Sequence, residues 1–598
     1  MLVERRRTAF PTAFLTRVGV AWAIISALLI LVNWGAITTW RFPDPDDTMR
    51  LIQVRDLLAG QSWFDVTQYR ADAPGGGVPM HWSRIVDLPL ALVILALTPF
   101  LGTASAEAAA LVIVPLITLA AAMILAARIA WRLLGDQETT FTALIVALCV
   151  PVVFQLGPMR IDHHGWQLVC ALAAVNGLMA RSSVTGGRVI GASLATWLAI
   201  SIEGLPLAAV VFAVLALRWL RDRRERVLLV SAIQSLALTS ATLFLATRGF
   251  GDLATYCDAV SPLHVAMFAF GAVVLTILGR FEPIPLGMLI GGFGLAGGGA
   301  LALMLYAAPQ CVTGGGFSEL DPLVHDFWYI DVREGMPVWH QSLKVALQYA
   351  ITPLIGLFAA IQLAARSQDW LRAFWGDYAM VLGAAILVSL LVARAGAVAC
   401  LLAAPPLAWQ LNQWLRGIRT IERPLPRVGA MLAVACALLP TLPLALAGLI
   451  MPARASEAAS PLQHVVQLKM SDCRIEASSD ILNALKPGEI YAPLDIAPKL
   501  LFLTHHSVPA TGHHRGNGTM RLVIATALGS SDDARAALLE RGSRYVAICP
   551  DLVEPQNYAF HAKDGFAADL REGRTPDWLQ PVATAENTSF KLWRVLPE

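Results

Sequence analysis

Charged side chains are scarce in this chain of 598 residues. Asp, Glu, Lys and Arg together make up 15% of it, 56% is hydrophobic, and the mean hydropathy is +0.59. A soluble protein of this length could not cover so much apolar surface with so few polar groups. The formal net charge of +2 also lacks the basic excess expected of a nucleic-acid-binding protein. We therefore expect a polytopic membrane protein.

A cleavable signal peptide is not expected at the start of this sequence. The first apolar run, residues 18–38, is too long for a signal-peptide core, and no A-x-A-like cleavage site follows it. We interpret this run as an uncleaved first span. The sequence shows neither an internal repeat nor a low-complexity segment.

The eight cysteines contain no C-x-x-C pair and have no nearby histidines at zinc-ligand spacing, so a metal site built on sulfur is not expected. Cys473 and Cys549 lie in a hydrophilic tail that we place outside the cytoplasm below. Cys257 and Cys311 lie in two outer loops and form a second candidate pair. In an oxidising compartment each pair is compatible with a disulfide or with free thiols.

The orientation follows from the basic loops, because Lys and Arg accumulate on the cytoplasmic side of a membrane. The N-terminus, with Arg5 to Arg7 and Arg17, is therefore placed inside. The other basic segments are 128–132, 181–188, 218–226, the segment around Arg280, 366–372 and 416–427. Thirteen apolar runs satisfy this arrangement and place the C-terminal tail outside: 18–38, 106–128, 139–157, 165–181, 188–202, 204–219, 227–246, 262–279, 284–307, 342–365, 377–394, 396–414 and 428–450.

One further apolar run, residues 86–101, does not fit this count. It has about sixteen residues with prolines near both ends, which is typical of a re-entrant or interfacial helix. The runs on either side of Glu203 are short, and we expect them to form a tight helical hairpin. The first outer loop is then 41–105 and a long outer loop is 308–341. Together, residues 1–451 form the transmembrane domain.

The tail, residues 452–598, differs in character. Short β-rich runs alternate with helical patterns such as SSDDARAALLERG, which opens on capping residues and ends on glycine. The β-rich runs are EIYAP, RLVIATA, RYVAIC and FKLWRV. We predict a small extracytoplasmic α/β domain after an all-α membrane domain.

Acidic and histidine residues gather at the outer ends of the predicted spans. Taken singly, each is compatible with a solvated loop. Taken jointly, ionisable groups beside apolar helices tend to mark function. Oxygen ligands beside histidines favour Mg²⁺ or Mn²⁺. Such an ion stabilises a phosphate leaving group as a Lewis acid. An arginine can bind phosphate with two hydrogen-bond donors. These residues are Asp44, Asp46, Asp47, Asp162, His163, His164, Glu203, Glu334 and Arg394.

Several of these motifs, in this order, resemble those of the oligosaccharyltransferase catalytic subunits, within the wider C-type membrane glycosyltransferases that use polyprenyl-linked sugar donors. Asp46 and Arg55 keep the family's nine-residue spacing after the first span. GVPMHWSRIVDLPLA, with His81, Trp82 and Asp87, is similar to the family's H-W/Y-G-P-L-x-D segment. DHH at 162–164 resembles the second acidic motif, and DVREGMP resembles S-V-x-E-x-x-P.

The resemblance implies roles for these residues. Asp46, Asp162, His164 and Glu334 would hold a divalent metal, Mn²⁺ or Mg²⁺, around the acceptor. Arg394 would contact the donor phosphate, although its spacing to LLAAPPLA is one helical turn longer than in the family, and His81 would assist it. Either Asp46 or Asp47 would act as the base, with Glu334 also catalytic. Whether His163 joins the metal is left open.

The resemblance also has a gap. The family's W-W-D-Y-G motif, which reads the Ser or Thr of an Asn-x-Ser/Thr acceptor, is missing from residues 450–598. The nearest string, WGDY at 375–378, falls on a predicted cytoplasmic loop, and we interpret it as a coincidence. THHSVPATGHHRGNGTM supplies His513, His514 and Arg515 instead, either as acceptor or phosphate contacts or as a solvated loop.

We therefore expect a membrane glycosyltransferase that moves a sugar or oligosaccharide from a polyprenyl (pyro)phosphate to a glycan or lipid acceptor, with metal assistance. The first alternative uses a polyprenyl monophosphate and needs fewer metal ligands. A second is an oligosaccharyltransferase that acts on protein. A third is a transporter or flippase of lipid-linked glycan, in which the acids form an ion path. A non-catalytic scaffold would leave the DHH motif without a purpose.

Overall fold

In the computed structural model the chain forms two compact units, and the structure describes residues 10–313, 317, 320–450 and 471–597. The first, here called the transmembrane unit, comprises residues 1–41, 82–315 and 333–452. The second, here called the α/β unit, comprises 42–81, 316–332 and 453–598. The α/β unit therefore takes in part of each predicted outer loop besides the tail.

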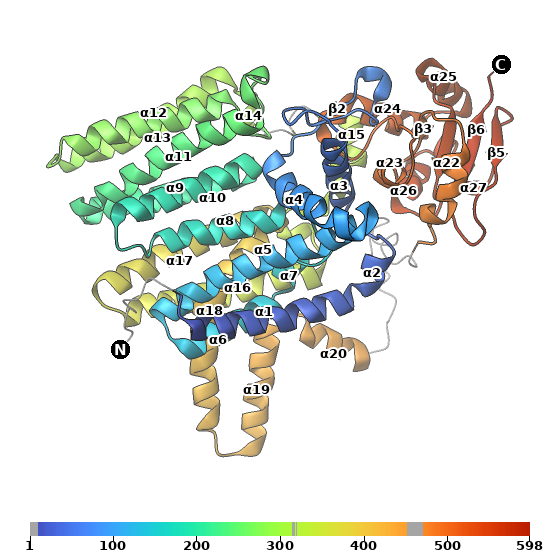
Figure 1. The fold of residues 1–598 in the computed structure, drawn as a ribbon. Coiled ribbons are helices and arrows are strands. Elements are labelled where there is room, and N and C mark those ends of the chain that lie inside the picture. The colour runs from blue at the N-terminus through green and yellow to red at the C-terminus, as the bar shows by residue number, and fades with distance from the viewer. Residues whose placement is uncertain (1–9, 314–316, 318–319, 451–470, 598) are drawn as a thin grey trace. The chain divides into compact units, whose positions relative to one another are not determined.

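The regular secondary structure of the transmembrane unit, among its described residues, consists of helices alone (Figure 1). Its helices are α1 (Thr12–Val32), α2 (Trp34–Thr38), α4 (Arg84–Leu101), α5 (Thr103–Leu133), α6 (Asp136–Leu148), α7 (Val150–Gln155), α8 (His164–Gly177), α9 (Ser183–Ile200), α10 (Leu205–Arg221), α11 (Arg226–Thr247), α12 (Pro262–Arg280), α13 (Leu286–Ala307), α14 (Gln310–Thr313), α16 (Leu343–Arg366), α17 (Asp369–Leu391), α18 (Gly396–Arg419), α19 (Pro424–Leu438) and α20 (Leu442–Ile450). Short 3₁₀ turns join several of them.

Nine helices among the described residues are long and apolar enough to cross a membrane, which indicates a multi-pass membrane protein. Every one of the thirteen predicted runs is helical. Eight of the nine helices match predicted runs, whereas five predicted runs do not give a helix of this kind: 139–157, 165–181, 188–202, 396–414 and 428–450. The run 139–157 breaks between α6 and α7, and the run 428–450 breaks between α19 and α20.

The run 86–101, which was expected to form a re-entrant or interfacial helix, also differs from the prediction. It forms the continuous 18-residue helix α4, which packs on α5 and is one of the nine spans by length and composition. Pro89 and Pro99 lie inside α4 without ending it. Proline is tolerated inside apolar helices when neighbouring groups satisfy the freed carbonyls, so these prolines were poor evidence against a span.

The helices pack closely where the side chains are small. In the order α8, α9, α11, α12 and α13, each helix packs against the next (Figure 1). Gly187 and Gly191 face α11, where an added Cβ at Gly191 would collide with the carbonyl oxygen of Ala232. Such small-xxx-small spacing lets two helix backbones approach and drives packing in membranes.

The WGDY string was expected on a loop, and this expectation is wrong. Residues 375–378 lie within α17, where Trp375 and Tyr378 are buried. Asp377 is fully buried and paired with Arg218, at 2.5 Å, and with Arg221, at 2.9 Å. This pairing balances the carboxylate and joins α17 to α10, so WGDY serves helix packing.

The α/β unit is built on a four-stranded sheet of order β3-β4-β6-β5. The strands are β3 (Ile490–Tyr491), β4 (Tyr545–Ile548), β5 (Leu579–Val582) and β6 (Lys591–Val595). β3 runs parallel to β4, and β6 is antiparallel to both β4 and β5. A separate antiparallel pair joins β1 (Thr67–Gln68) to β2 (Val78–Pro79). The helices of the unit are α3 (Pro45–Leu58), α15 (Pro322–Phe327), α22 (Ser479–Ala484), α23 (Ala497–Leu503), α24 (Asn517–Leu528), α25 (Ser531–Arg541), α26 (Val553–His561) and α27 (Phe566–Glu572).

Three of the four predicted β-rich runs contain strands β3, β4 and β6. The fourth, RLVIATA, forms helix α24 instead. Met520, Val523, Ile524 and Ala527 are its buried apolar residues, at helical spacing, so the helical period outweighed the β-branched composition. The predicted capped helix is confirmed as α25, with a capping box between Ser530 and Asp533.

Both candidate cysteine pairs form disulfides. Cys257 is bonded to Cys311 in the transmembrane unit, and Cys473 to Cys549 in the α/β unit. Each bond therefore closes within a single unit.

Candidate functional site

The turn between α7 and α8 carries the DHH motif. Asp162 Oδ1 accepts a hydrogen bond from the backbone N–H of His164 at 2.9 Å, which fixes the start of α8. Asp162 Oδ2 lies 2.9 Å from Nη2 of Arg160, and both side chains are almost completely buried. Burial opposes the charge of Asp162, but Arg160 and the two histidine rings hold its pKa below the ordinary value.

Glu334 reaches the same turn from the 3₁₀ turn Arg333–Gly335. Its Oε1 lies 3.7 Å from Nε2 of His164, and its Oε2 lies 4.0 Å from Nη2 of Arg160. Burial raises the pKa of this carboxyl, yet His164 and the two arginines outweigh burial and lower it. Glu334 is therefore ionised at neutral pH.

Arg394 closes the cluster from the 3₁₀ turn Ala393–Ala395. Its Nη2 lies 2.7 Å from Glu203 Oε1, and its Nη1 lies 3.5 Å from Glu334 Oε1. The backbone N–H of Ala393 donates to the carbonyl of Met336 at 3.0 Å, which ties this turn to the segment that carries Glu334.

These contacts define the acid–arginine cluster, which draws on four separate segments. Its members are Arg160, Asp162, His163, His164, Glu203, Glu334 and Arg394. Six of the seven were singled out from the sequence, and the structure brings all six together. Arg160 was missed, although it lies two residues before Asp162 in the sequence. A cation so close to an apolar helix end was the available signal.

Two hydrogen-bonding contacts orient the ring of His164. Trp197, on α9, donates its indole N–H to Gln167 Oε1 at 2.9 Å, and the Gln167 amide lies 3.3 Å from His164 Nδ1. Nε2 of His164 is thereby left to face the carboxylates. His163, His164 and Glu203 each offer a donor atom, and these atoms all lie within 4.8 Å of one another. This mixed nitrogen and oxygen set fits a divalent metal ion by type and spacing.

The first acidic motif lies in the α/β unit. Asp44 caps α3 by accepting from the backbone N–H of Asp46 at 2.9 Å. Asp47 is completely buried, whereas the Asp46 side chain is 31% exposed. Asp46 is therefore the more accessible of the two candidate bases.

The loop that carries His513, His514 and Arg515, here called the HHR loop, belongs to the same unit as Asp46. Nε2 of His513 lies 3.3 Å from Asp46 Oδ1, and its Nδ1 is 2.8 Å from the hydroxyl of Thr511. Arg515 donates to the carbonyl of Met80 at 3.3 Å. The loop is thus packed onto the first acidic segment.

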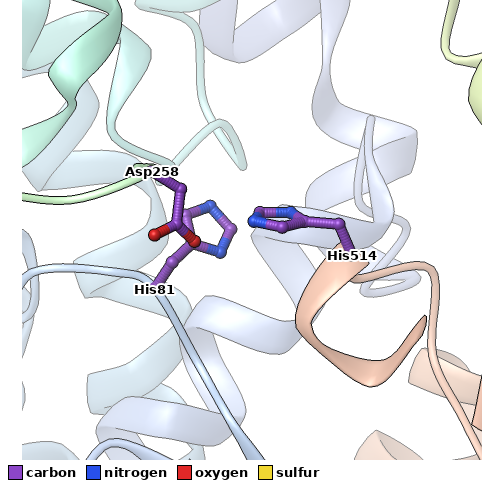
Figure 2. Close-up of side chains that lie close together, drawn as sticks. All are labelled: His81, Asp258 and His514. Atoms are coloured by element: carbon purple, nitrogen blue, oxygen red, sulfur yellow. The ribbon is translucent and has the colours of Figure 1, made fainter. Parts of the chain in front are cut away.

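The rings of His81 and His514 are in contact in the same unit, with centroids 4.7 Å apart and planes tilted by 49° (Figure 2). Asp258, also drawn in Figure 2, belongs to the transmembrane unit. Arg55, which keeps the nine-residue spacing to Asp46, donates to the carbonyl of Phe502 at 3.3 Å and lies over its ring. Asp87 is paired with Arg84 at 3.2 Å, with both side chains completely buried. Arg55 and Asp87 therefore each have a packing role in this chain.

Solved structures of an archaeal oligosaccharyltransferase have a fold similar to that of this chain. The archaeal oligosaccharyltransferase AglB from Archaeoglobus fulgidus, in complex with an inhibitory peptide and a dolichol-phosphate, matches with a TM-score of 0.65 and 14% identity, over 95% of this chain and 72% of that chain. The chain has the fold of the C-type membrane glycosyltransferases. The structure of the A. fulgidus enzyme tethered to an acceptor peptide containing the NVT sequon matches with a TM-score of 0.65 and 15% identity, over 94% and 72%. Its complex with Zn and sulfate matches with a TM-score of 0.59 and 14% identity, over 96% and 72%.

At the sequence level no family model and no curated protein matches this chain. At 14–15% identity the likeness to the C-type membrane glycosyltransferases is one of fold, so the chemistry must be argued from this chain's own residues.

Proposed function

We propose that this protein is a membrane glycosyltransferase that moves a sugar or oligosaccharide from a polyprenyl (pyro)phosphate donor to an extracytoplasmic acceptor. The observation that carries the proposal is the acid–arginine cluster, in which four loop segments of a C-type fold bring two arginines, two histidines and three carboxylates together. Such a group of balanced charges at the ends of apolar helices suits a phosphate that develops charge as its bond to the sugar breaks.

Arg394 is the proposed donor-phosphate ligand. Its side chain is 19% exposed and its partners Glu203 and Glu334 are about one-third exposed, whereas Arg160 and Asp162 are closed off. A phosphate that enters the cluster thus meets Arg394 before Arg160. Arg394 presents a planar fork of donors to the departing oxygens, and Arg160 holds Asp162 in place behind it.

A divalent cation is proposed as an assistant. His163, His164 and Glu203 have suitable donor spacing, and Asp162 and Glu334 lie beside His164. Because two of the donors are imidazole nitrogens, this set favours Mn²⁺ over Mg²⁺. When bound, the cation would act as a Lewis acid on the phosphate. Asp46, which the resemblance adds to the metal ligands, is here assigned to the acceptor.

The acceptor is proposed to be a glycan or lipid hydroxyl. Asp46 Oδ1 lies 3.3 Å from Nε2 of His513, and the Asp46 side chain is 31% exposed, so this carboxylate is accessible to take the proton of an attacking hydroxyl. Asp47 is too buried for this role. The absence of W-W-D-Y-G argues against an Asn-x-Ser/Thr peptide as acceptor.

The test is transfer by the purified full-length protein from a labelled polyprenyl-linked glycan, with glycan, lipid and peptide acceptors offered separately. We expect glycan or lipid product, formed faster with Mn²⁺ than with chelator. Activity that is indifferent to chelator would remove the metal from the proposal. Product on the peptide alone would support an oligosaccharyltransferase. Movement of the lipid-linked glycan across vesicles without any transfer would support a transporter.

A further inference from the structure

The α/β unit carries a series of aromatic rings in contact, here called the aromatic ladder, which consists of His81, His514, Phe317, Tyr329 and His325. The centroid distances along it are 4.7 Å, 4.8 Å, 5.0 Å and 5.5 Å. The rings are tilted by 33° to 49° to one another. Three separate segments of the chain contribute to it.

The aromatic ladder is not part of the core of its unit. Phe327 and Trp328, from the same segment as Tyr329, pack onto the core of the α/β unit, but no ring of the ladder belongs to that core. Four of the five side chains are half-buried, and His325 is exposed. Rings that are in contact with one another and partly open to solvent offer a ligand an aromatic surface.

Polar groups flank the rings. His325 Nδ1 lies 2.8 Å from Asp326 Oδ1, and the half-buried guanidinium of Arg515 follows His514 directly in the chain. A sugar ring has the matching chemistry, since its C–H face packs against an aromatic face while its hydroxyls, at the edge, exchange hydrogen bonds with charged side chains. An acyl chain has no hydrogen-bonding groups to offer to these side chains.

We propose that the aromatic ladder is the subsite that holds the sugar residues of a glycan acceptor. This inference rests on the proposed function and deepens it, because it selects a glycan over a lipid or a peptide. The ladder also leads to the acceptor base. His514, its second ring, is the chain neighbour of His513, whose Nε2 lies 3.3 Å from Asp46 Oδ1. A glycan along the ladder would thus end with a hydroxyl at Asp46.

The experiment compares Phe317→Leu and Tyr329→Leu with the parent, using full-length protein in nanodiscs. Acceptor KM and donor KM are measured with neutral hexopyranose and pentofuranose oligosaccharides as acceptors. We expect each substitution to raise the acceptor KM about five- to tenfold, because one stacking contact is lost. The kcat and the donor KM should stay within about twofold. Phe560→Leu is the matched control, since Phe560 is an exposed ring of the same unit outside the ladder.

A second readout separates this inference from the proposed function. Saturation-transfer NMR of the same oligosaccharides with the parent reports binding whether or not transfer occurs. Signal that is present in the parent and in Phe560→Leu, and is lost in both ladder variants, supports the ladder even if the parent transfers nothing. An unchanged acceptor KM in both variants of an active enzyme, or oligosaccharide signal absent from the parent, would overturn it.

Discussion

At the scale of single residues, the cluster divides into a closed part and an open part. The Arg160–Asp162 pair is fully buried, so it is held by mutual attraction and by the hydrogen bond that Asp162 accepts from His164. Arg394, Glu203 and Glu334 retain solvent contact, so they are free to exchange partners with a ligand. We therefore expect substitutions in the closed part to change stability and those in the open part to change activity.

Asp162→Asn should destabilise the protein because Arg160 would then be a buried charge without its carboxylate. Breaking a buried ion pair on one side costs about 3–5 kcal/mol. Thermal unfolding in detergent should show a lower Tm for Asp162→Asn. The double variant Asp162→Asn with Arg160→Gln should recover part of this loss. Equal Tm values for parent and single variant would refute the structural role of the pair.

Arg394→Ala should lower kcat/KM by roughly 10²–10³, the usual loss when a donor aimed at developing charge is removed. Arg394→Lys should restore only part of the rate, because a single ammonium lacks the planar fork of donors. Initial rates of transfer at several donor concentrations give kcat/KM for each variant. Arg280→Ala, an exposed arginine at the end of α12, is the control and should behave like the parent.

At the scale of elements, small residues decide how close the helices can approach. Gly191→Leu should force α9 away from α11, because a side chain there collides with the backbone at Ala232 and Leu236. Gly294→Leu in α13 is the matched control, because a Cβ added at Gly294 meets no atom within 4 Å. Overpacking typically costs about 1–3 kcal/mol. Denaturation monitored by tryptophan fluorescence should show early unfolding for Gly191→Leu alone, and coincident curves would contradict the packing.

A buried carboxyl makes the α/β unit sensitive to pH. Glu554 accepts hydrogen bonds from the backbone N–H groups of Leu494 and Asp495 and from the Tyr558 hydroxyl. These donors lower its pKa, but burial and the charge of Asp495 prevail and raise it to about 8. The folded protein therefore binds more protons than the unfolded chain between pH 4.5 and 8, so stability falls as pH rises through this window.

Glu554→Gln should remove most of this dependence, because an amide has no proton to lose. We expect the parent to need less denaturant to unfold at pH 8 than at pH 5, with a smaller difference in the variant. Denaturation curves at both pH values, followed by near-UV circular dichroism, provide the measurement. A parent that is more stable at pH 8 would show that Glu554 is ionised in the fold.

At the scale of the whole molecule, most of the helices and part of the acidic cluster could be predicted from the sequence, whereas Asp44, Asp46 and Asp47, which were expected with the other acids, belong to the α/β unit. Apolar runs are a strong local signal. Asp162, Glu203 and Arg394 stood at the ends of predicted spans, and Glu334 stood in the predicted long outer loop. Features that depend on contacts between distant parts of the chain could not be predicted from the sequence. The β-branched residues of α24 hid its helical period. The role of Arg160 follows from its ion pair with Asp162, and the role of Asp377 follows from its ion pair with Arg218 on α10. The grouping of residues 42–81 with the C-terminal tail is likewise a tertiary fact.

The most direct measurement is a single-turnover reaction of the purified protein with a labelled polyprenyl-linked donor and a glycan acceptor, following acceptor product and released lipid (pyro)phosphate together. The account predicts that both appear in equal amounts in the parent. Asp46→Asn and Glu334→Gln should each lose both products while keeping the parent's unfolding curve. Transfer at the parental rate in both variants would contradict the assignment of these carboxylates to the reaction, and with it the central claim.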